Sequence, residues 1–467
     1  MPRRQWYTAR ATTYISEPCP TLSASTRDHR HLNAGMRTVR RWAARLQQIV
    51  ASIHGSGRVL AWMFLGLSLA AMLSQFYRTS TAVIASDLRR DLPLTPEALG
   101  MLTGAFFIAF ACAQVPAGML IDRYGPRSTI SLLLLVAITG AIAFAAASSV
   151  DVLILARVLM GIGCSGIMMS SFIVCSRWFA ARNFTLIISV LLAISNAGVL
   201  VATAPMAAAV GAIGWRGTFW FAAAVTAITA VIVFLRVRDA PPDHAYYARP
   251  RESTSEMFKG MREVLSNRQL PFVLAITFVS YGTLVTVLAL WGAPYLLDVH
   301  KLDRTQAGHV LFVMVLAAII GNVVYGVLER LLNTRKRLIL GGGTGSTITL
   351  GALAFLPHPD FWAAVVLLTL FSGFTAFSAV IIAHARSLFA DHLVGRGMTT
   401  ANIFTMLGAG TLQVITGLVA GSFGTNGGVA SANAYRSVFA TLAGILGLAL
   451  LIFSRARETR PSDYERK

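Results

Sequence analysis

Two arginines, Arg78 and Arg157, lie inside long apolar segments of the sequence, where a charged side chain is costly and needs a partner or a role. Arg78 precedes Asp87 by nine residues, which is about 14 Å along a helix and roughly half the thickness of a bilayer core. All 20 Asp and Glu residues lie in tails, loops or ends of predicted helices. We therefore expect Arg78 to bind an anion, because a guanidinium binds carboxylate or phosphate through paired hydrogen bonds. The alternative is a structural arginine satisfied by helix-end carbonyls or by water.

Neighbouring polar and aromatic side chains extend this candidate site. The candidate binding residues are Arg78, Tyr77, Gln114, Arg157, Tyr281 and Trp291. Each also has a structural alternative, because such side chains more often join helices or anchor them at the membrane surface. Arg157 lies six residues after Asp151 and is thus expected nearer a surface than Arg78. Proton coupling could use His309 or His384, because the unperturbed pKa of a histidine side chain lies near neutrality. Their positions near helix ends favour exposed histidines over proton coupling.

A short charged hairpin separates two apolar segments at Gly118-Met-Leu-Ile-Asp122-Arg123-Tyr-Gly125-Pro-Arg127. We expect Gly118 to permit the close approach of two helix backbones. Gly125 is expected to adopt a turn conformation that a Cβ atom would strain. Asp122, Arg123 and Arg127 would form charge pairs that hold this end of the molecule in one of two arrangements. The alternative is a basic turn that only orients the helices.

Composition indicates that apolar helices must position these residues. The chain has 467 residues, of which 55% are hydrophobic and 13% charged, and its mean hydropathy is +0.64; a soluble globular protein is therefore excluded. About 20 apolar residues span a bilayer. The predicted spans are 59–84, 98–118, 128–148, 151–174, 184–210, 216–236, 270–294, 306–328, 338–356, 361–383, 398–421 and 434–454. The weakest is 338–356, so eleven or thirteen spans are alternatives to twelve.

The basic residues are distributed unevenly over the predicted loops. The net charge of +20 might indicate nucleic acid, but its distribution indicates a membrane. On one side the loops hold only Arg89, Arg90, Arg216, Lys301, Arg304 and Arg436. Most other basic residues lie in the tails and in the loops of the opposite side, which predicts that both termini are cytoplasmic.

The chain divides into two six-helix halves. The predicted parts are a basic cytoplasmic tail (1–58), a first bundle (59–236), a cytoplasmic linker (237–269), a second bundle (270–454) and a basic tail (455–467). Residues 36–53 predict a helix on the membrane surface; a transit peptide and a later start at Met36 are alternatives. Gly326-Val-Leu-Glu329-Arg330 repeats the charged hairpin imperfectly, with its acid one position nearer the glycine. Parallel repeats of this kind place a binding site between the halves.

The hairpin resembles the loop between helices 2 and 3 of the major facilitator superfamily. Ala156-Arg157 followed by Gly161, Gly163 and Gly166 is similar to the helix-4 pattern of that family. The resemblance implies a structural role for Arg157, because the family pattern has an arginine there across many substrates. The run from Tyr77 to Leu88 resembles its sugar-phosphate and organic-anion permeases. By contrast, the segment from Asn196 to Pro205 lacks most of the antiporter signature of drug exporters. The resemblance implies an all-α fold of twelve transmembrane helices in two six-helix bundles, covering about residues 59–454.

These observations predict an alternating-access transporter of a small organic anion, a carboxylate or phosphate ester, in a bacterial inner membrane. The hairpin residues and their copy, Glu329 and Arg330, would act as the gate. The alternatives are efflux of drugs or metabolites, and a membrane sensor or scaffold that does not transport. We expect no enzyme, cofactor, metal or nucleic-acid partner; the glycines from Gly341 to Gly345 lack the P-loop ending. The expected partners are the substrate and the lipid bilayer, and the expected state is a monomer.

Overall fold

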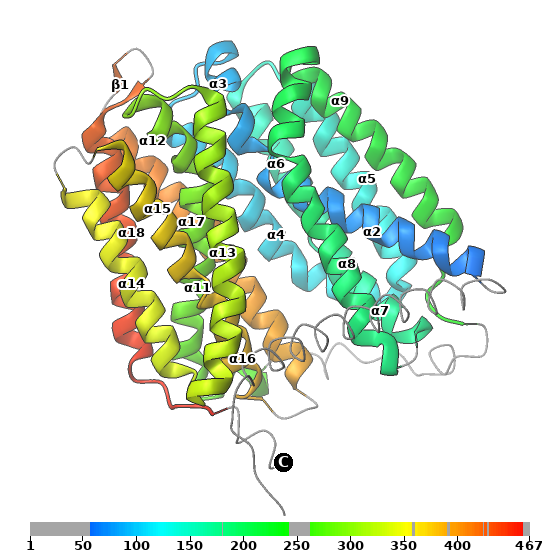
Figure 1. Cartoon of the computed structure of the whole chain (residues 1–467). Helices are drawn as coiled ribbons and strands as arrows, with labels where there is room; N and C mark the ends of the chain where they lie inside the picture. Colours follow the sequence, from blue (N-terminus) through cyan, green and yellow to red (C-terminus); the bar gives the residue numbers. More distant parts are fainter. Residues whose placement is uncertain are drawn as a thin grey trace, which may run out of the picture. The chain divides into compact units, whose positions relative to one another are not determined.

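The computed structural model describes residues 57–179, 181–241, 262–356, 360–389, 393–423, 425–426 and 429–460 (Figure 1). The chain forms two compact units, Met1–Ala61 and Trp62–Lys467. The surface helix predicted at 36–53, most of the N-terminal tail and the middle of the linker lie outside the described residues. The predicted division into five parts therefore stays a prediction.

Helices make up almost all of the described structure. Those of the first half are α2 (Gly57–Thr79), α3 (Thr81–Asp91), α4 (Pro96–Tyr124), α5 (Pro126–Ala145), α6 (Val150–Cys164), α7 (Ile167–Trp178), α8 (Ala181–Val201) and α9 (Ala204–Arg236). Those of the second half are α11 (Leu270–Thr286), the π-helical turn η2 (Val287–Trp291), α12 (Gly292–Asp298), α13 (Arg304–Leu332), α14 (Lys336–Phe355), α15 (Phe361–Thr375), α16 (Ser378–Arg386), α17 (Val394–Gly421) and α18 (Ala432–Phe453). One small hairpin, β1 (Thr425–Asn426) with β2 (Val429–Ala430), departs from the all-α expectation.

Among the described residues, eleven helical segments are long and apolar enough to cross a membrane. Leu186–Val201 is a shorter apolar helix at the place of the fifth predicted span. The predicted segment 338–356 is among the eleven, as Lys336–Phe355. The predicted fifth span, 184–210, is not one continuous helix, because α8 ends at Val201. The predicted separation of the fifth and sixth spans between residues 210 and 216 is confirmed, because the backbone leaves the helical conformation at Gly214 (φ +71°) within α9. Thr203 leaves the helical conformation and Pro205 opens α9, which a proline does readily in the first turn of a helix.

The halves meet where α4 of the first packs against α17 of the second. A Cβ atom on Gly104 would lie 2.7 Å from the carbonyl oxygen of Gly410, and one on Gly100 would lie 2.6 Å from that of Gln413. Only glycine permits helix backbones to come this close. This contact lies toward the start of α4, at the end of the molecule that carries residues 92–95. We call this the loop end, and the end that carries Asp122–Arg127 the hairpin end.

Candidate functional site

Arg78 lies in the last turn of α2, half-buried, with its guanidinium carbon 5.0 Å from the centre of the Phe110 ring on α4. The cation–π contact holds the side chain without neutralising its charge. Its Nε atom is buried and has no hydrogen-bond partner. Within the described part of the chain, no carboxylate forms an ion pair with Arg78. A guanidinium in this state retains the capacity to bind an anion.

Arg157 has a different environment from Arg78. It is 0% exposed and lies over the Phe106 ring at 4.5 Å. Its Nη1 atom donates to the carbonyl oxygen of Tyr77 at 2.5 Å, and its Nε atom donates to that of Leu102 at 3.3 Å. Arg157 thus joins α6 to both α2 and α4, and it holds the backbone immediately before Arg78. These contacts support the structural role that the family resemblance implied for Arg157. Of its guanidinium nitrogens, Nη2 is buried without a partner.

The other candidate side chains divide into two groups. Tyr77 is 1% exposed and its hydroxyl shares a hydrogen bond of 2.7 Å with Thr226 of α9. Trp291 is fully buried and donates to Thr416 at 2.9 Å. Both are therefore engaged in helix packing.

Gln114 and Tyr281 retain unused polar groups. Gln114, one turn beyond Phe110 on α4, is buried with its Oε1 atom unpartnered. Tyr281 is half-buried on α11, and no hydrogen bond of its hydroxyl is described. Gln114 thus lies close along α4 to the ring that covers Arg78, whereas the structure gives no contact between Tyr281 and Arg78.

Two residues near Arg78 were not predicted. Phe110 is apolar and resembles its many neighbours in α4, so nothing in its local sequence marks it as the contact of Arg78. Gln75 lies one turn before Arg78 and donates to the side chain of Asn196 on α8 at 3.3 Å. Gln75 and Asn196 are both polar residues within apolar segments, and this is the signal that could have paired them.

The hairpin has the predicted turn at Gly125, where φ is +84°. The role expected of Gly118 is wrong, because a Cβ atom there would meet nothing within 4 Å, and the close glycine contacts lie at Gly100 and Gly104 instead. Arg127 begins the next helix: its backbone N–H donates to the Asp239 carboxylate at 2.7 Å and its Nε atom to the carbonyl of Phe234 at 2.9 Å. Asp239, at the end of α9, therefore caps α5 from a distant part of the sequence.

The remaining hairpin acids and bases are exposed. Asp122 and Arg123 both lie on the surface, and the Arg123 guanidinium lies 5.5 Å from the centre of the Tyr124 ring. Asp122 has an interaction of its own. A charge pair between Asp122, Arg123 and Arg127 that latches the hairpin end stays a prediction.

The second half repeats this capping arrangement. Glu458, which follows α18, accepts from the backbone N–H groups of Arg335 at 2.9 Å and Lys336 at 3.0 Å, and from the Thr334 hydroxyl at 2.8 Å. Glu458 thus caps α14 as Asp239 caps α5. Glu329 pairs with the Nε atom of Arg335 at 2.6 Å, so the acid of the imperfect copy is used within its own half. Arg330 is exposed.

Charged contacts close the loop end. Arg89 of α3 lies 3.7 Å from Asp298 of α12, which also accepts a hydrogen bond from the Tyr435 hydroxyl. Asp91 accepts from Trp215 and from Arg216, each at 2.8 Å. The hydrogen bond from Trp215 and the charge of Arg216 hold the pKa of Asp91 below its usual value. Arg89 and Asp298 join the two halves at the loop end, the end that also carries the α4–α17 contact.

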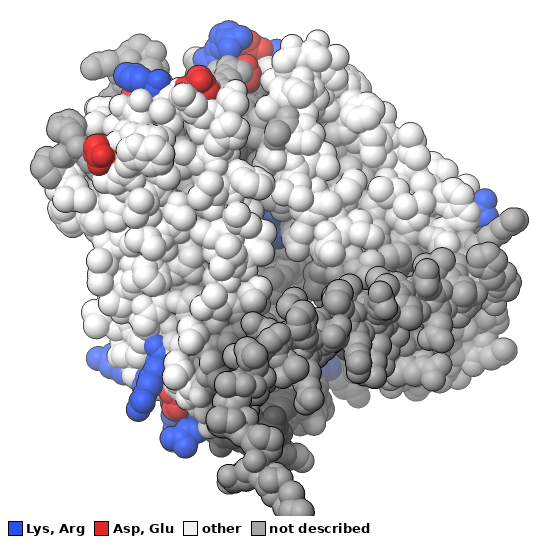
Figure 2. Space-filling model, in the orientation of Figure 1, with Lys and Arg blue, Asp and Glu red and all other residues white. Residues whose placement is uncertain are grey.

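Figure 2 shows that charged residues gather at the two ends of the molecule and leave an uncharged band between them. A small basic surface is visible in a recess of this band. The band matches the eleven apolar spans, since lipid-facing helices carry few charges.

Comparison with known proteins agrees with this architecture. The sequence model described as "Major Facilitator Superfamily" matches residues 67–351 and 273–467. The chain belongs to the major facilitator superfamily. Transporters of this superfamily are multi-pass membrane proteins, and the resemblance of the hairpin and of the Arg157 region to the superfamily is thereby confirmed.

Three curated relatives of this superfamily member are named for anions. The probable sulfoacetate transporter SauU of Cupriavidus necator is 24% identical over 66% of this chain and 75% of its own length. A nitrate/nitrite transporter, NrtP of Nostoc punctiforme, is 28% identical over 42% and 41%. The probable galactarate/D-glucarate transporter GudP of Bacillus subtilis is 20% identical over 80% and 90%.

A solved structure shares the major facilitator fold of this chain. It is a bacterial homologue of the human lysosomal transporter Spinster, with a TM-score of 0.64 and 17% identity, covering 86% of this chain and 96% of the other. The likeness confirms the fold of two six-helix bundles.

In this superfamily member, enlarging Gly104 should destabilise the protein, whereas enlarging Gly118 on the same helix should not. Gly104→Leu should lower the free energy of unfolding of the purified protein by about 1–3 kcal/mol, because the leucine side chain would overlap the backbone of α17. Gly118→Leu is the matched control on the same helix and should leave stability unchanged, since space surrounds that position. Thermal unfolding of both variants in one detergent tests this, and equal destabilisation would contradict the described α4–α17 contact.

The cap at α14 should be lost at acid pH. Burial opposes ionisation of Glu458, but hydrogen bonds from Lys336, Arg335 and Thr334 outweigh it and lower its pKa. Because the folded pKa is the lower one, the cap stabilises the protein above about pH 4.5 and its effect is lost as pH falls through the folded pKa. Glu458→Gln should lower the free energy of unfolding by about 1 kcal/mol at neutral pH, which is the usual effect of losing a cap. Below the folded pKa of Glu458 the substitution should have no effect, because the wild-type carboxyl is then protonated. Melting curves from pH 3 to 7 measure this; Asp360→Asn, at the local cap of α15, is the control.

Proposed function

We propose that this transporter carries a small organic anion and binds it at Arg78. The observation that carries this proposal is the state of Arg78: a guanidinium within the apolar spans, held by a ring rather than by a carboxylate, with a buried Nε atom lacking a partner. An anion would supply the missing charge and hydrogen bonds. Gln114, whose amide oxygen is buried and unpartnered, is the second residue that we assign to the site.

The relatives support the class of cargo. The two that align over most of their own lengths are named for sulfoacetate and for galactarate and D-glucarate. These substrates share a carboxylate at neutral pH, and a planar guanidinium pairs with a carboxylate through two parallel hydrogen bonds. The nitrate/nitrite relative aligns over less than half of either chain, so we favour an organic anion over nitrate.

The described acids give little support to proton coupling through a carboxylate beside Arg78. His384 is the other candidate for proton coupling. Its position near a helix end predicted an exposed side chain, but the residue is buried, with 1% exposure. Its Nδ1 atom shares a hydrogen bond of 2.8 Å with the Thr459 hydroxyl, close to the cap that Glu458 forms. His384 therefore belongs to the contacts of the hairpin end, whereas Arg78 lies in the last turn of α2.

We further propose that the hairpin end faces the cytoplasm of a bacterial cell, with both chain termini on that side of the inner membrane. The excess of Lys and Arg in the loops of that end supports this orientation. The α4–α17 contact and the Arg89–Asp298 pair would then close the external side in the described conformation. Access of a membrane-impermeant thiol reagent to Cys residues placed in loop 92–95 and beside Arg123 of whole cells tests this; labelling only beside Arg123 would contradict it.

Reconstituted protein tests the proposed cargo directly. Thermal unfolding of the purified protein should shift upward with a carboxylate such as sulfoacetate or D-glucarate, and less with nitrate, by mass action of a bound ligand. Liposomes containing the protein should take up the same radiolabelled carboxylate. A shift with cationic dyes alone would favour drug efflux, and a shift with nitrate alone would replace the organic anion by an inorganic one.

A further inference from the structure

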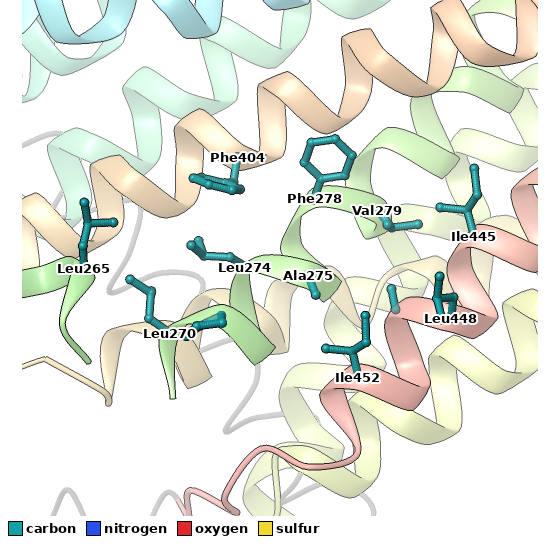
Figure 3. A pocket seen from close by; sticks show the side chains of 12 residues that line it. Leu265, Leu270, Leu274, Ala275, Phe278, Val279, Phe404, Ile445, Leu448 and Ile452 are labelled. Atoms are coloured by element: carbon teal, nitrogen blue, oxygen red, sulfur yellow. The ribbon is translucent and has the colours of Figure 1, made fainter. Parts of the chain in front are cut away.

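An apolar groove lies between α11, α17 and α18 (Figure 3). Its volume is about 580 Å³. The lining residues are Leu265, Leu270, Pro271, Leu274, Ala275, Phe278, Val279, Phe404, Ile445, Leu448, Ala449 and Ile452. Leu265 and Leu448 are 54% and 59% exposed, so the groove is open rather than enclosed, and it lacks polar lining residues.

The groove reaches from the hairpin end to the middle of the membrane. Leu270 and Ile452 lie at the start of α11 and near the end of α18, both at the hairpin end. Nine residues separate Leu270 from Val279, which is about 14 Å along a helix and roughly half of a hydrocarbon core. This depth matches one leaflet, and therefore the length of a phospholipid acyl chain rather than of a small solute.

Basic residues occur in the two chain segments that carry the groove lining at the hairpin end. Arg262 and Arg268 lie on either side of Leu265, and Arg455 and Arg457 follow Ile452. All four are exposed, and none of the four guanidinium groups has an ion pair or a hydrogen bond within the described part of the chain. Four cations at one rim are unfavourable together unless an anion lies among them.

Local hydrogen bonds hold this rim in place, and the nearby acids have interactions of their own. Asn267 donates to the carbonyl of Leu388 at 3.0 Å, and the backbone N–H of Arg457 donates to Gln269 at 2.8 Å. The second bond joins the two segments that carry the arginines. Glu263 has an interaction of its own, and Glu458 is bound to the start of α14.

We propose that this groove binds an anionic phospholipid, with one acyl chain along α11 and α18 and its phosphate beside Arg268 and Arg457. Basic clusters at the membrane surface attract anionic headgroups, each arginine contributing about a fivefold change in binding. The apolar groove supplies the second part of the recognition, because an acyl chain fills it and a free phosphate does not. This site is separate from Arg78 and does not depend on the identity of the transported anion.

Native mass spectrometry of the full-length protein, released from nanodiscs of phosphatidylglycerol or phosphatidylcholine, tests the proposal. The wild type should retain one phosphatidylglycerol at collision energies that remove phosphatidylcholine. Arg268→Gln should weaken this retention about fivefold. Ala275→Phe should abolish it, because Ala275 lines the middle of the groove (Figure 3). Thermal unfolding in detergent verifies that both variants are folded.

Matched variants separate this site from general surface charge and general bulk. Arg337→Gln removes an exposed arginine of the same half that lies at the start of α14, outside the groove, and Ala318→Phe enlarges a half-buried alanine on α13. Both should retain the lipid as the wild type does. Equal loss in Arg268→Gln and Arg337→Gln, or equal retention of both lipids, overturns the proposal. Loss of a dimer signal in Ala275→Phe without loss of lipid would assign the groove to a second copy of the chain and also overturn it.

Discussion

Arg78→Lys is expected to reduce carboxylate uptake by about 10- to 100-fold while the protein keeps its fold. Lysine retains the positive charge but offers a single ammonium group in place of the planar pair of N–H donors. Losing one hydrogen bond to a charged group costs about 1.5–3 kcal/mol, and each 1.4 kcal/mol is a factor of ten. The measurement is initial uptake by liposomes that contain equal amounts of protein, together with the thermal shift that saturating carboxylate produces.

A control on the adjoining helix makes the Arg78 result specific. Arg90→Lys changes an arginine of α3 whose side chain is 70% exposed and whose described partner is Asp87 at 3.4 Å. This variant should transport as the wild type does. If Arg78→Lys retained both uptake and the ligand-induced thermal shift at matched protein amounts, the anion would have to bind elsewhere, and Arg78 would be a structural residue held by Phe110.

The membrane spans could be predicted from the sequence because a long apolar segment bounded by charges is rarely compatible with any structure except a membrane-spanning helix. The end of α8 could not be predicted in this way. Thr203 lies between Ala202 and Ala204, and only its backbone conformation departs from the helix. Gly118 was assigned a close contact that belongs to Gly104. The Gly100-x-x-x-Gly104 spacing carried that signal, but a glycine pair does not reveal which other helix it faces.

The site was less predictable than the fold, and the reason is helix rotation. An amphipathic helix reveals its buried face by its pattern, whereas helices that are apolar on every side do not. Tyr77 and Arg78 are neighbours in sequence, yet the tyrosine is enclosed against α9 and the arginine retains partial exposure. Asp239 was missed for a different reason: it caps a helix that begins more than a hundred residues earlier, and no local pattern records such a contact.

Arg157→Gln is expected to destabilise the protein and to weaken substrate binding indirectly. Its guanidinium is fully buried and donates to carbonyls of two other helices. Glutamine reaches at most one of them, so the loss is about 3 kcal/mol at 1.5–3 kcal/mol for each bond to a charged donor. For a chain of this length, that corresponds to a melting temperature lower by roughly 3 °C. Because one acceptor is the carbonyl of Tyr77, the backbone that carries Arg78 should also shift, and the substrate concentration for half-maximal uptake should rise.

Two comparisons distinguish this positioning role from direct binding by Arg157. Arg436→Gln removes a guanidinium that donates to a carbonyl, that of Ala354, at 2.8 Å in the second half; it should lower the melting temperature less and leave uptake unchanged. Arg157→Lys keeps the charge and should recover part of the stability and, with it, part of the affinity. A direct ligand of the anion would behave differently. Arg157→Lys would then leave the ligand-free melting temperature at its wild-type value and lose only the shift produced by the carboxylate, whereas a positioning residue changes both together.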